Sequence, residues 1–314
     1  MKKRILLTLG DPNGIGPEII LKILGSRIFK NTFIKAIGPR GVFDFYSKKL
    51  KINKIDAENL IHISGYDTFK PVPGKASRLA GRISGDSIRL ASDLCLHKEY
   101  DAMITMPISK ESLNAGGYDF PGHTEMLTYY SGSVDTLMIM YSPELIIANA
   151  TNHIPLSRIS RIINKSFIKK KIISFNNILV SELGVIKPTI AVLSFNPHNG
   201  DGGALGNEEQ RYFLPAINEL KNDGLSVFGT FAADSYFANK TYKKFDSTLA
   251  VYHDQGLTPF KMLSGKKGVN YTGGLKIVRT SPDHGTAFDI AGKGLADISS
   301  SIAAVKLALK IINS

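Results

Sequence analysis

The sequence predicts an α/β fold, because short apolar segments with strand character alternate with longer segments of helical periodicity along the whole chain. The chain has 314 residues, enough for about two domains of roughly 150 residues each. With 43% apolar and 21% charged residues, its composition is that of an ordinary globular protein. It contains no internal repeats, low-complexity stretches or long linkers, so any domain boundary must follow from topology.

The expected strands are short runs rich in Ile, Val, Leu and Thr. They cover residues 3–9, 33–37, 102–105, 136–140, 145–148, 189–195, 226–231 and 248–252. Residues 136–140 and 145–148 are separated by a turn at Ser142 and Pro143, which favours an antiparallel pair.

The expected helices are longer segments in which apolar side chains recur every three to four positions. They cover residues 18–29, 40–50, 79–97, 166–183, 207–220 and 299–312. Pro17 favours the start of the first helix, because proline suits the first helical position. Residues 79–97 keep the helical spacing despite Gly81 and Gly85.

The formal net charge of +12 raises the question of a nucleic-acid partner. The basic residues are scattered, and no helix-turn-helix, zinc-finger or RNP aromatic pattern accompanies them. We therefore expect no nucleic acid and interpret the surplus as a solvated surface with a few cations for an anionic substrate.

No apolar run approaches the roughly 18 to 20 residues that span a bilayer, so we expect no membrane partner. The basic start followed by Ile5–Leu9 lacks a cleavage site and is interpreted as a first strand, which predicts a cytoplasmic protein. Cys95 is the sole cysteine and lies in a helical apolar pattern, which is typical of a buried, inert thiol.

A glycine-rich turn follows the first expected strand, at residues 10–18, with the sequence GDPNGIGPE. It resembles the start of a dinucleotide-binding motif, but Ile19 occupies the position of the third glycine. No acidic residue ends a second strand about 20 residues later, so we expect no Rossmann cofactor site here. The turn is either a plain connection or a loop whose backbone approaches a ligand.

Three histidines lie just after apolar runs that are far apart in the chain: His153 in ATNHIP, His198 in FNPHNGDGG and His253 in VYHDQGL. Imidazole groups at the ends of several strands suit Zn²⁺, Co²⁺ or Mn²⁺ with open positions for a substrate. A loop histidine can also be purely structural, and we assign no function to His62 and His97.

Longer motifs give a more specific indication: GDPNGIGPEI at 10–19, PGHTE at 121–125, HDQGLTPFK at 253–261, GVNYTGGL at 268–275 and RTSPDHGTAFDIAGKG at 279–294. With the three histidine stretches, they resemble the 4-hydroxythreonine-4-phosphate dehydrogenase family of vitamin B6 biosynthesis, in order and over nearly the whole chain. Close relatives with similar motifs act on phosphorylated four-carbon sugar acids such as phosphothreonate.

The resemblance implies a fold like that of isocitrate and isopropylmalate dehydrogenases, with two α/β/α domains and an active-site cleft between them. We expect residues 1–128 and 278–314 to form the first domain and residues 129–277 to form the second. The family also implies a homodimer with active sites at the subunit interface.

The resemblance assigns roles to individual residues. One divalent metal per site, Zn²⁺, Co²⁺ or Mg²⁺, would be held by His153, His198 and His253, with His153 and His198 from one subunit and His253 from the other. The phosphorylated substrate would be bound by His123, Thr124, Lys261, Asn270 and Arg279, and Asp234 would be catalytic. Lys110 also lies in a family motif, but Met106 occupies a position that the family fills with a small residue.

The implied reaction is the NAD- or NADP-linked oxidation of 4-phosphooxy-L-threonine to 2-amino-3-oxo-4-phosphooxybutanoate, followed by decarboxylation to 3-amino-2-oxopropyl phosphate. A bound metal would lower the pKa of the substrate hydroxyl as hydride leaves for the nicotinamide. Asp234, His123 and a metal-bound water are the candidate bases.

Three alternatives remain. The chain could be a dehydrogenase of a related phosphorylated four-carbon sugar acid. Three histidines and an aspartate would also suit a metal-dependent phosphoester hydrolase. A basic binding module would retain nucleic acid in a salt-sensitive manner.

Overall fold

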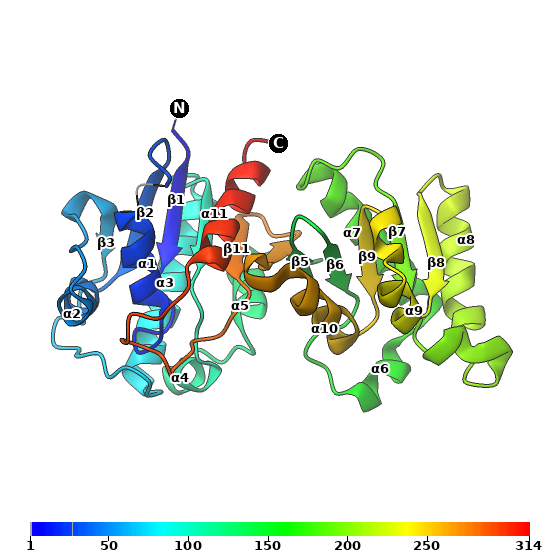
Figure 1. Ribbon diagram of the computed structural model, residues 1–314, viewed down its shortest axis with the longest axis horizontal. Coiled ribbons are helices and arrows are strands. Elements are labelled where there is room, and N and C mark those ends of the chain that lie inside the picture. Colours follow the sequence, from blue (N-terminus) through cyan, green and yellow to red (C-terminus); the bar gives the residue numbers. More distant parts are fainter. Residues whose placement is uncertain (1, 27) are drawn as a thin grey trace. The chain divides into compact units, whose positions relative to one another are not determined.

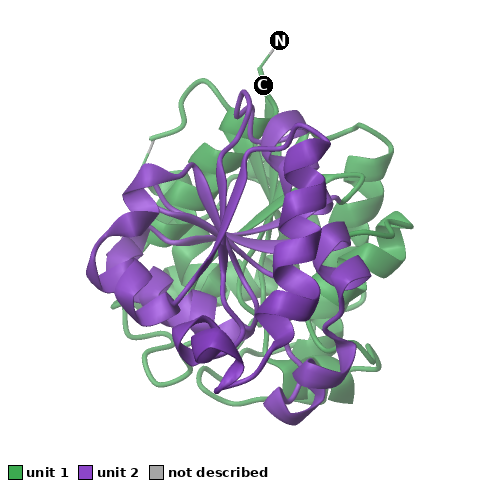
Figure 2. Cartoon of the chain, turned by 90° about the vertical axis from the view of Figure 1, so that its right-hand side faces the viewer, with its two compact units in different colours: residues 1–136, 275–313 green, residues 137–274, 314 purple. Residues whose placement is uncertain are grey.

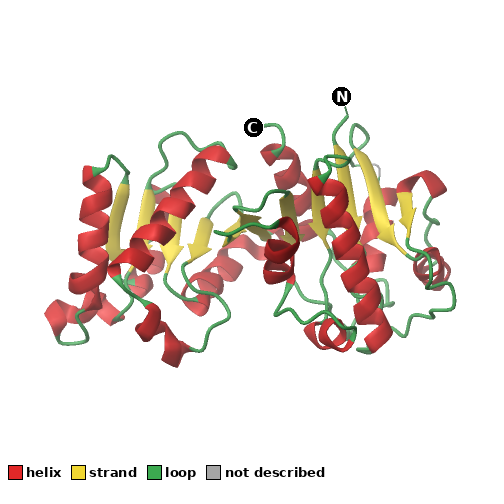
Figure 3. Cartoon of the chain, turned by 180° about the vertical axis from the view of Figure 1, so that it is seen from behind, coloured by secondary structure: helices red, strands yellow, loops and turns green. Residues whose placement is uncertain are grey.

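A computed structural model describes residues 2–26 and 28–314, which divide into two compact units (Figure 2). Unit 1 consists of the residues up to Thr136 together with Leu275–Asn313, and unit 2 consists of Leu137–Gly274 with Ser314. Helices flank the strands in each unit, as α/β alternation requires (Figure 3).

Unit 1 contains a parallel sheet to which both ends of the chain contribute (Figure 1). The strand order is β3 (Leu60–His62), β2 (Phe33–Gly38), β1 (Arg4–Thr8), β4 (Ala102–Thr105) and β11 (Val278–Pro282). Because β11 pairs with β4, a segment near the C-terminus completes a sheet that begins at the N-terminus.

The helices of unit 1 cover both faces of this sheet, since Leu6 and Leu7 of β1 are both fully buried although their side chains alternate. The helices are α1 (Gly16–Gly25), α2 (Arg40–Leu50), α3 (Arg78–Leu96), α4 (Lys110–Ala115), α5 (His123–Ser131) and α11 (Ser299–Ile311), with a 3₁₀ turn η1 (Ala57–Asn59). Leu6 and Met103 share one core cluster with residues of α3, α4 and α5.

The loop after β1 is fixed by contacts within unit 1. The side chain of Asn13 accepts a hydrogen bond from the amide of Val72 and donates to the carbonyl of Lys75, both at 2.8 Å. The amide of Ile15 donates to the carbonyl of Thr286 at 3.1 Å. The glycine-rich loop therefore joins two other segments of the unit.

Unit 2 contains a mixed sheet (Figure 1). The strand order is β10 (Val269–Gly273), β5 (Leu137–Tyr141), β6 (Ile146–Asn149), β9 (Ser247–Ala250), β7 (Ile190–Leu193) and β8 (Val227–Phe231). Strand β5 is antiparallel to both of its neighbours, whereas β6, β9, β7 and β8 are parallel. The carboxyl ends of β6, β9 and β7 therefore lie at one edge of the sheet.

The helices of unit 2 are α6 (Leu156–Ile162), α7 (Lys165–Ser181), α8 (Leu214–Asn222), α9 (Ala233–Ala238) and α10 (His253–Ser264). Short turns η2 (Pro197–Gly203), η3 (Glu209–Phe213), η4 (Thr241–Lys244) and η5 (Gly265–Lys267) connect them. Met140, Leu193 and Phe260 are among the buried residues of one core cluster. Within residues 2–26 and 28–314, no helix is both long enough and apolar enough to cross a membrane.

The expected α/β class is confirmed, as are the antiparallel pair β5 and β6 and the long helices α3, α7 and α11. The helix expected at 18–29 spans Gly16–Gly25 in the structure, and residue 27 lies outside the described residues. The helix expected at 207–220 is divided into a π-helical turn η3 and α8. Pro215 explains the division, because it has no N–H to donate to the carbonyl four residues earlier.

Several elements differ from the expectations. Strands β10 and β11 and the short helices α4, α5, α6, α9 and α10 were not predicted. No helix was expected at residues 121–125, but His123 begins α5, and His253, expected just after a strand, begins α10. Helix α10 contains Gly256 and Pro259, which weaken helical propensity, and α5 is only nine residues long.

The fold predicts opposite effects for two glycine substitutions. Gly10 has φ +70°, and a Cβ atom there would lie 2.4 Å from the carbonyl oxygen of Pro107. Gly10→Ala should therefore lower the free energy of unfolding by at least about 2 kcal/mol. A Cβ atom added at Gly41, in α2, would have no other heavy atom within 4 Å, so Gly41→Ala should raise stability by about 0.5–1 kcal/mol. Urea unfolding of both variants is the measurement, and equal stabilities would contradict the assignment of Gly10.

Candidate functional site

His153 and His253 lie side by side in unit 2. Their segments follow the parallel neighbours β6 and β9, and the pairing continues beyond the strands, since the amide of Thr151 donates to the carbonyl of Val251 at 3.1 Å. The two imidazole rings are 5.6 Å apart between centroids and tilted by 42°. Two ligands of one tetrahedral metal, each with a metal–nitrogen distance of about 2.1 Å, would place their ring centres roughly 5 Å apart.

Asp254 orients the ring of His253. Its Oδ1 atom lies 2.6 Å from Nδ1 of His253. Because a carboxylate only accepts hydrogen bonds, Nδ1 is the donor, and in the neutral ring the lone pair is then on Nε2. A histidine whose second nitrogen binds a carboxylate is the usual arrangement of a metal ligand.

His198 lies in an unusual turn after β7. His198, Asn199 and Asp201 have φ values of 50°, 57° and 44°, so three non-glycine residues adopt the left-handed region within five positions. Between them, Gly200 has φ 77°, and a Cβ atom there would lie 2.4 Å from the carbonyl oxygen of Gly206. The turn, which we call the His198 turn (Pro197–Gly203), therefore depends on glycine at this position.

Glu209 stabilises the segment that leads into the His198 turn. This side chain belongs to a residue that is only 2% exposed, and its Oε1 atom accepts hydrogen bonds from the amides of Phe195 at 2.8 Å and Asn196 at 2.7 Å. Its Oε2 atom accepts a third from Nδ2 of Asn196 at 2.9 Å. Strain in the turn is thus balanced by a buried carboxylate that satisfies three N–H donors.

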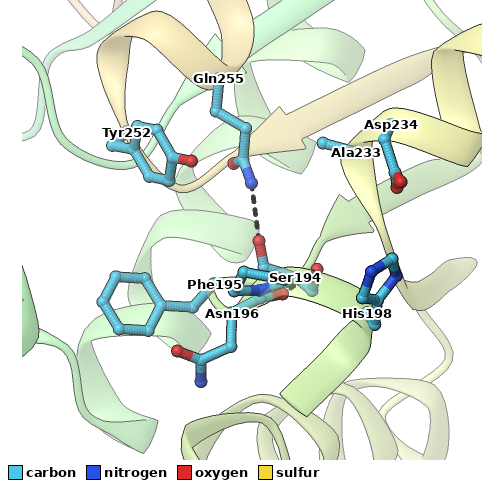
Figure 4. A pocket seen from close by; sticks show the side chains of 9 residues that line it. Ser194, Phe195, Asn196, His198, Ala233, Asp234, Tyr252 and Gln255 are labelled. Atoms are coloured by element: carbon cyan, nitrogen blue, oxygen red, sulfur yellow. Dashed lines mark hydrogen bonds between the residues drawn. The ribbon is translucent and has the colours of Figure 1, made fainter. Parts of the chain in front are cut away.

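A cavity of about 250 Å³ adjoins this turn in unit 2 (Figure 4). Among its lining residues are His198, Asp234, Tyr252 and Gln255. Asp234 lies in the first turn of α9, and Figure 4 shows its side chain on the same side of the cavity as the ring of His198. The cavity therefore combines an imidazole, a carboxylate, a phenol and a carboxamide.

The three predicted metal ligands do not form one cluster within the chain. Among the described residues, no group of three or more His, Cys, Asp or Glu side chains has metal-binding geometry. Within one chain His153 lies beside His253, because their segments follow the parallel neighbours β6 and β9. The expectation that His153 and His198 share a subunit stays a prediction, and the adjacency of His153 and His253 favours the alternative that these two share one.

A second group of polar residues surrounds Arg279 in unit 1. This residue lies in β11 beside β4 and is only 2% exposed. Its Nε and Nη2 atoms donate to Oγ1 of Thr105 at 2.9 and 2.7 Å. Burial lowers the pKa of Arg279 to about 9, and the negative charge of Glu125 opposes this shift. A cation this deeply buried provides strong attraction for an anionic group.

His123 is close enough to Arg279 for the two to interact electrostatically. Burial and the charge of Arg279 lower the pKa of His123 well below its usual value, while a hydrogen bond to the backbone of Met106 opposes the shift. The ring is therefore neutral at physiological pH. Its Nε2 atom is buried and has no hydrogen-bond partner within the part of the chain that the structure describes.

The remaining predicted substrate residues are divided between the units. Thr124 is the second residue of α5 in unit 1. Lys261 is exposed on α10, the helix that begins at His253, and Asn270 lies in β10, both in unit 2. The Oδ1 atom of Asn270 is buried without a hydrogen-bond partner among the described residues.

Three site residues were not predicted from the sequence: Thr105, Glu125 and Gln255. Each lies in or beside a recognised motif, but none has a side chain that indicates function by its type alone. Thr105 ends β4, next to the strand of Arg279, and that neighbour relation became visible only from the sheet order. Lys110, expected from the family motif, is the first residue of α4.

The sequence family described as "Pyridoxal phosphate biosynthetic protein PdxA" matches residues 25–308 of the chain. The chain belongs to this family.

PdxA-family relatives match over the whole length. A 4-hydroxythreonine-4-phosphate dehydrogenase of Sulfurihydrogenibium is 39% identical over 98% of this chain and 97% of its own length. A D-threonate 4-phosphate dehydrogenase of Salmonella typhimurium is 33% identical over 98% of this chain and 99% of its own.

Solved structures agree with this assignment. The crystal structure of a 4-hydroxythreonine-4-phosphate dehydrogenase from Klebsiella pneumoniae has a TM-score of 0.86 at 33% identity and covers 100% of this chain and 99% of its own. An isocitrate dehydrogenase from Methylococcus capsulatus shares the fold at 14% identity, with a TM-score of 0.51 and coverage of 98% and 85%. The expected family and fold type are thereby confirmed, and the chain is an oxidoreductase.

The environment of His123 predicts a pH dependence of stability. Its folded-state pKa is below the unfolded value of about 6.5, so below that pH the unfolded chain binds the proton more readily. Stability should fall with decreasing pH by up to about 1.4 kcal/mol per pH unit from this group alone. His123→Gln should remove this part of the slope in urea unfolding between about pH 7 and pH 5. An unchanged slope in His123→Gln would show that His123 titrates normally.

Proposed function

We propose that this chain is a metal-dependent, NAD- or NADP-linked dehydrogenase. It oxidises 4-phosphooxy-L-threonine to 2-amino-3-oxo-4-phosphooxybutanoate, which loses carbon dioxide to give 3-amino-2-oxopropyl phosphate in pyridoxal phosphate biosynthesis. Membership of the PdxA family and the names of its relatives support this activity.

The observation that carries the proposal is the buried Arg279 beside a neutral imidazole. Arg279 supplies a planar cation for a phosphate or carboxylate, and Thr105 fixes the orientation of its guanidinium group. His123 supplies a buried Nε2 atom that is neutral and can accept a hydrogen bond. Thr124, Lys261 and Asn270 complete the proposed set of substrate-binding residues.

The residues present suit a divalent metal. His153 and His253 have the ring separation of two ligands, and Asp254 directs the Nε2 lone pair of His253 away from itself. We propose that these two histidines and His198 of the partner subunit hold one Zn²⁺, Co²⁺ or Mg²⁺ ion in each active site of a homodimer. Such a metal would supply Lewis-acid polarisation of the substrate hydroxyl, and bound NAD or NADP would supply the hydride acceptor.

The side chains of this protein then have two tasks. Arg279 and Lys261 bind the anionic groups and so orient the carbon that is oxidised. Asp234, in the cavity beside His198, and Nε2 of His123 are the two side-chain positions proposed to take the hydroxyl proton. The product ketone is β to a carboxylate, so the electrons of the C–C bond enter the carbonyl as carbon dioxide leaves.

A second candidate substrate is D-threonate 4-phosphate. It is favoured by the 33% identical relative from Salmonella typhimurium that bears this name. The two substrates differ at C2, where one has an amine and the other a hydroxyl group. Both retain the phosphate and carboxylate that Arg279 and Lys261 would bind.

An assay of nicotinamide reduction with both substrates, with and without a chelator, distinguishes these activities. Nicotinamide reduction should be observed with 4-phosphooxy-L-threonine and should exceed that with D-threonate 4-phosphate. A chelator should abolish it, because a hydroxyl group donates hydride poorly until its proton is nearly lost, and Zn²⁺, Co²⁺ or Mg²⁺ should restore it. Activity that survives in metal-free protein would contradict the metal requirement, and release of phosphate without nicotinamide would indicate a hydrolase.

The proposed ligand partition predicts the activity of mixed dimers. In a dimer of one His198→Ala and one His253→Ala subunit, one site lacks two of its histidines and the other site keeps all three ligands. Isolated heterodimers should therefore recover about half of the wild-type activity, although each parent homodimer is inactive.

A second heterodimer is the matched control. His153→Ala and His253→Ala remove ligands that we assign to the same subunit, so each site of this heterodimer lacks one histidine. It should remain as inactive as its parents. Recovered activity in this pair would instead place His153 and His253 in different subunits of each site.

A further inference from the structure

Gln255 joins two strand ends in unit 2. Its Oε1 atom accepts a hydrogen bond from the amide of Val251 at 2.7 Å. Its Nε2 atom donates to the carbonyl of Ser194 at 2.7 Å, a hydrogen bond drawn in Figure 4. Val251 follows β9 and Ser194 follows β7, and the backbone register of these two parallel strands ends at Val192 and Leu249. The carboxamide therefore extends the connection between β7 and β9 beyond their last backbone pair.

This connection lies between the segments that carry two of the histidines. Gln255 is two residues after His253 on α10, and Ser194 is four residues before His198. On the other side of β9, the carbonyl of Val251 accepts hydrogen bonds from the amide and the hydroxyl group of Thr151, at 3.1 and 2.8 Å. The segments of all three histidines are thus linked through Val251.

If Ser194 moved, the His198 turn that follows it in the chain would move with it. Ser194 and Val251 are 2% and 1% exposed, so a backbone group that lost its hydrogen bond to Gln255 would have little access to bulk water. The next two residues, Phe195 and Asn196, donate their amides to the buried carboxylate of Glu209. Gln255 and Glu209 therefore hold three consecutive residues at the entrance of the turn from two different elements.

Both hydrogen bonds of Gln255 require a primary carboxamide. It accepts from an N–H group with one atom and donates to a carbonyl with the other. Glutamate at this position would keep the acceptor for Val251 but would place a carboxylate oxygen against the carbonyl of Ser194. Methionine would keep the length of the side chain and lose both hydrogen bonds.

We propose that Gln255 is a positioning residue that fixes the His198 turn and the start of α10 in each chain, so that His198 is held in place for one metal site of the dimer and His253 for the other, and that this positioning determines how tightly the histidines bind a divalent metal. The inference rests on the proposed function, since it assumes that His198 and His253 are metal ligands. Loss of a side chain that orients metal ligands typically weakens metal binding by about 10- to 100-fold.

The test uses the full-length protein and Co²⁺, whose binding is followed by visible absorbance in competition with a chelator. Gln255→Met should bind Co²⁺ about 10- to 100-fold more weakly than wild type and with an altered absorbance spectrum. The exposed Gln210 lies in the same unit, and Gln210→Met should leave affinity and spectrum unchanged. In the absence of metal, hydrogen exchange at the Val251 amide should be faster in Gln255→Met than in wild type, and it should be unchanged in Gln210→Met.

Gln255→Glu removes the hydrogen bond to Ser194 and keeps the hydrogen bond to Val251. It therefore tests the proposal even if Gln255→Met fails to fold. It should weaken Co²⁺ binding while keeping slow exchange at Val251, because only the bond to Ser194 is lost. If wild type binds Co²⁺ and both Gln255 variants bind it equally well, the positioning role is wrong and the metal site stands. If wild-type protein binds no Co²⁺, the proposed metal site itself is wrong, whatever the exchange at Val251.

Discussion

The parallel direction of β6, β9 and β7 is the constraint on which the candidate site of unit 2 depends. Parallel strands bring their carboxyl ends to one edge, and each of these three strands is followed by a histidine-bearing segment. The side chains are then placed by specific groups rather than by the strands alone. Asp254 orients His253, Glu209 fixes the approach to the His198 turn, and Gln255 links the two segments.

In unit 1, the charge states of the candidate site residues are determined by burial. Arg279 and the Nε2 atom of His123 are both buried, and burial disfavours the charged form of each side chain. The arginine remains a cation because its normal pKa is so high, whereas the histidine becomes neutral. One desolvated region thus presents a positive group and an uncharged imidazole side by side, which two exposed side chains of these types would not do.

The sequence was sufficient for the α/β class, for the hairpin of β5 and β6, and for the helices with long apolar periodicity. It was insufficient for α5, which is only nine residues long, and for α10, whose Gly256 and Pro259 suggest a loop. The histidine motifs indicated strand ends correctly, but the pairing of His153 with His253 depends on strand order, which no local pattern encodes. The roles of Gln255 and Thr105 were invisible for the same reason, because their partners lie 61 and 174 positions away.

The interleaved topology of unit 1 has a consequence for its synthesis. Strand β4 emerges from the ribosome long before β11, its neighbour in the finished sheet, and the whole of unit 2 is made in between. At roughly 5–20 residues per second, that interval is on the order of 10 s. During this time the apolar strand Ala102–Thr105 has an unpaired edge, which is the kind of surface that associates with other nascent chains. A chaperone's protection would therefore matter most while the ribosome translates unit 2.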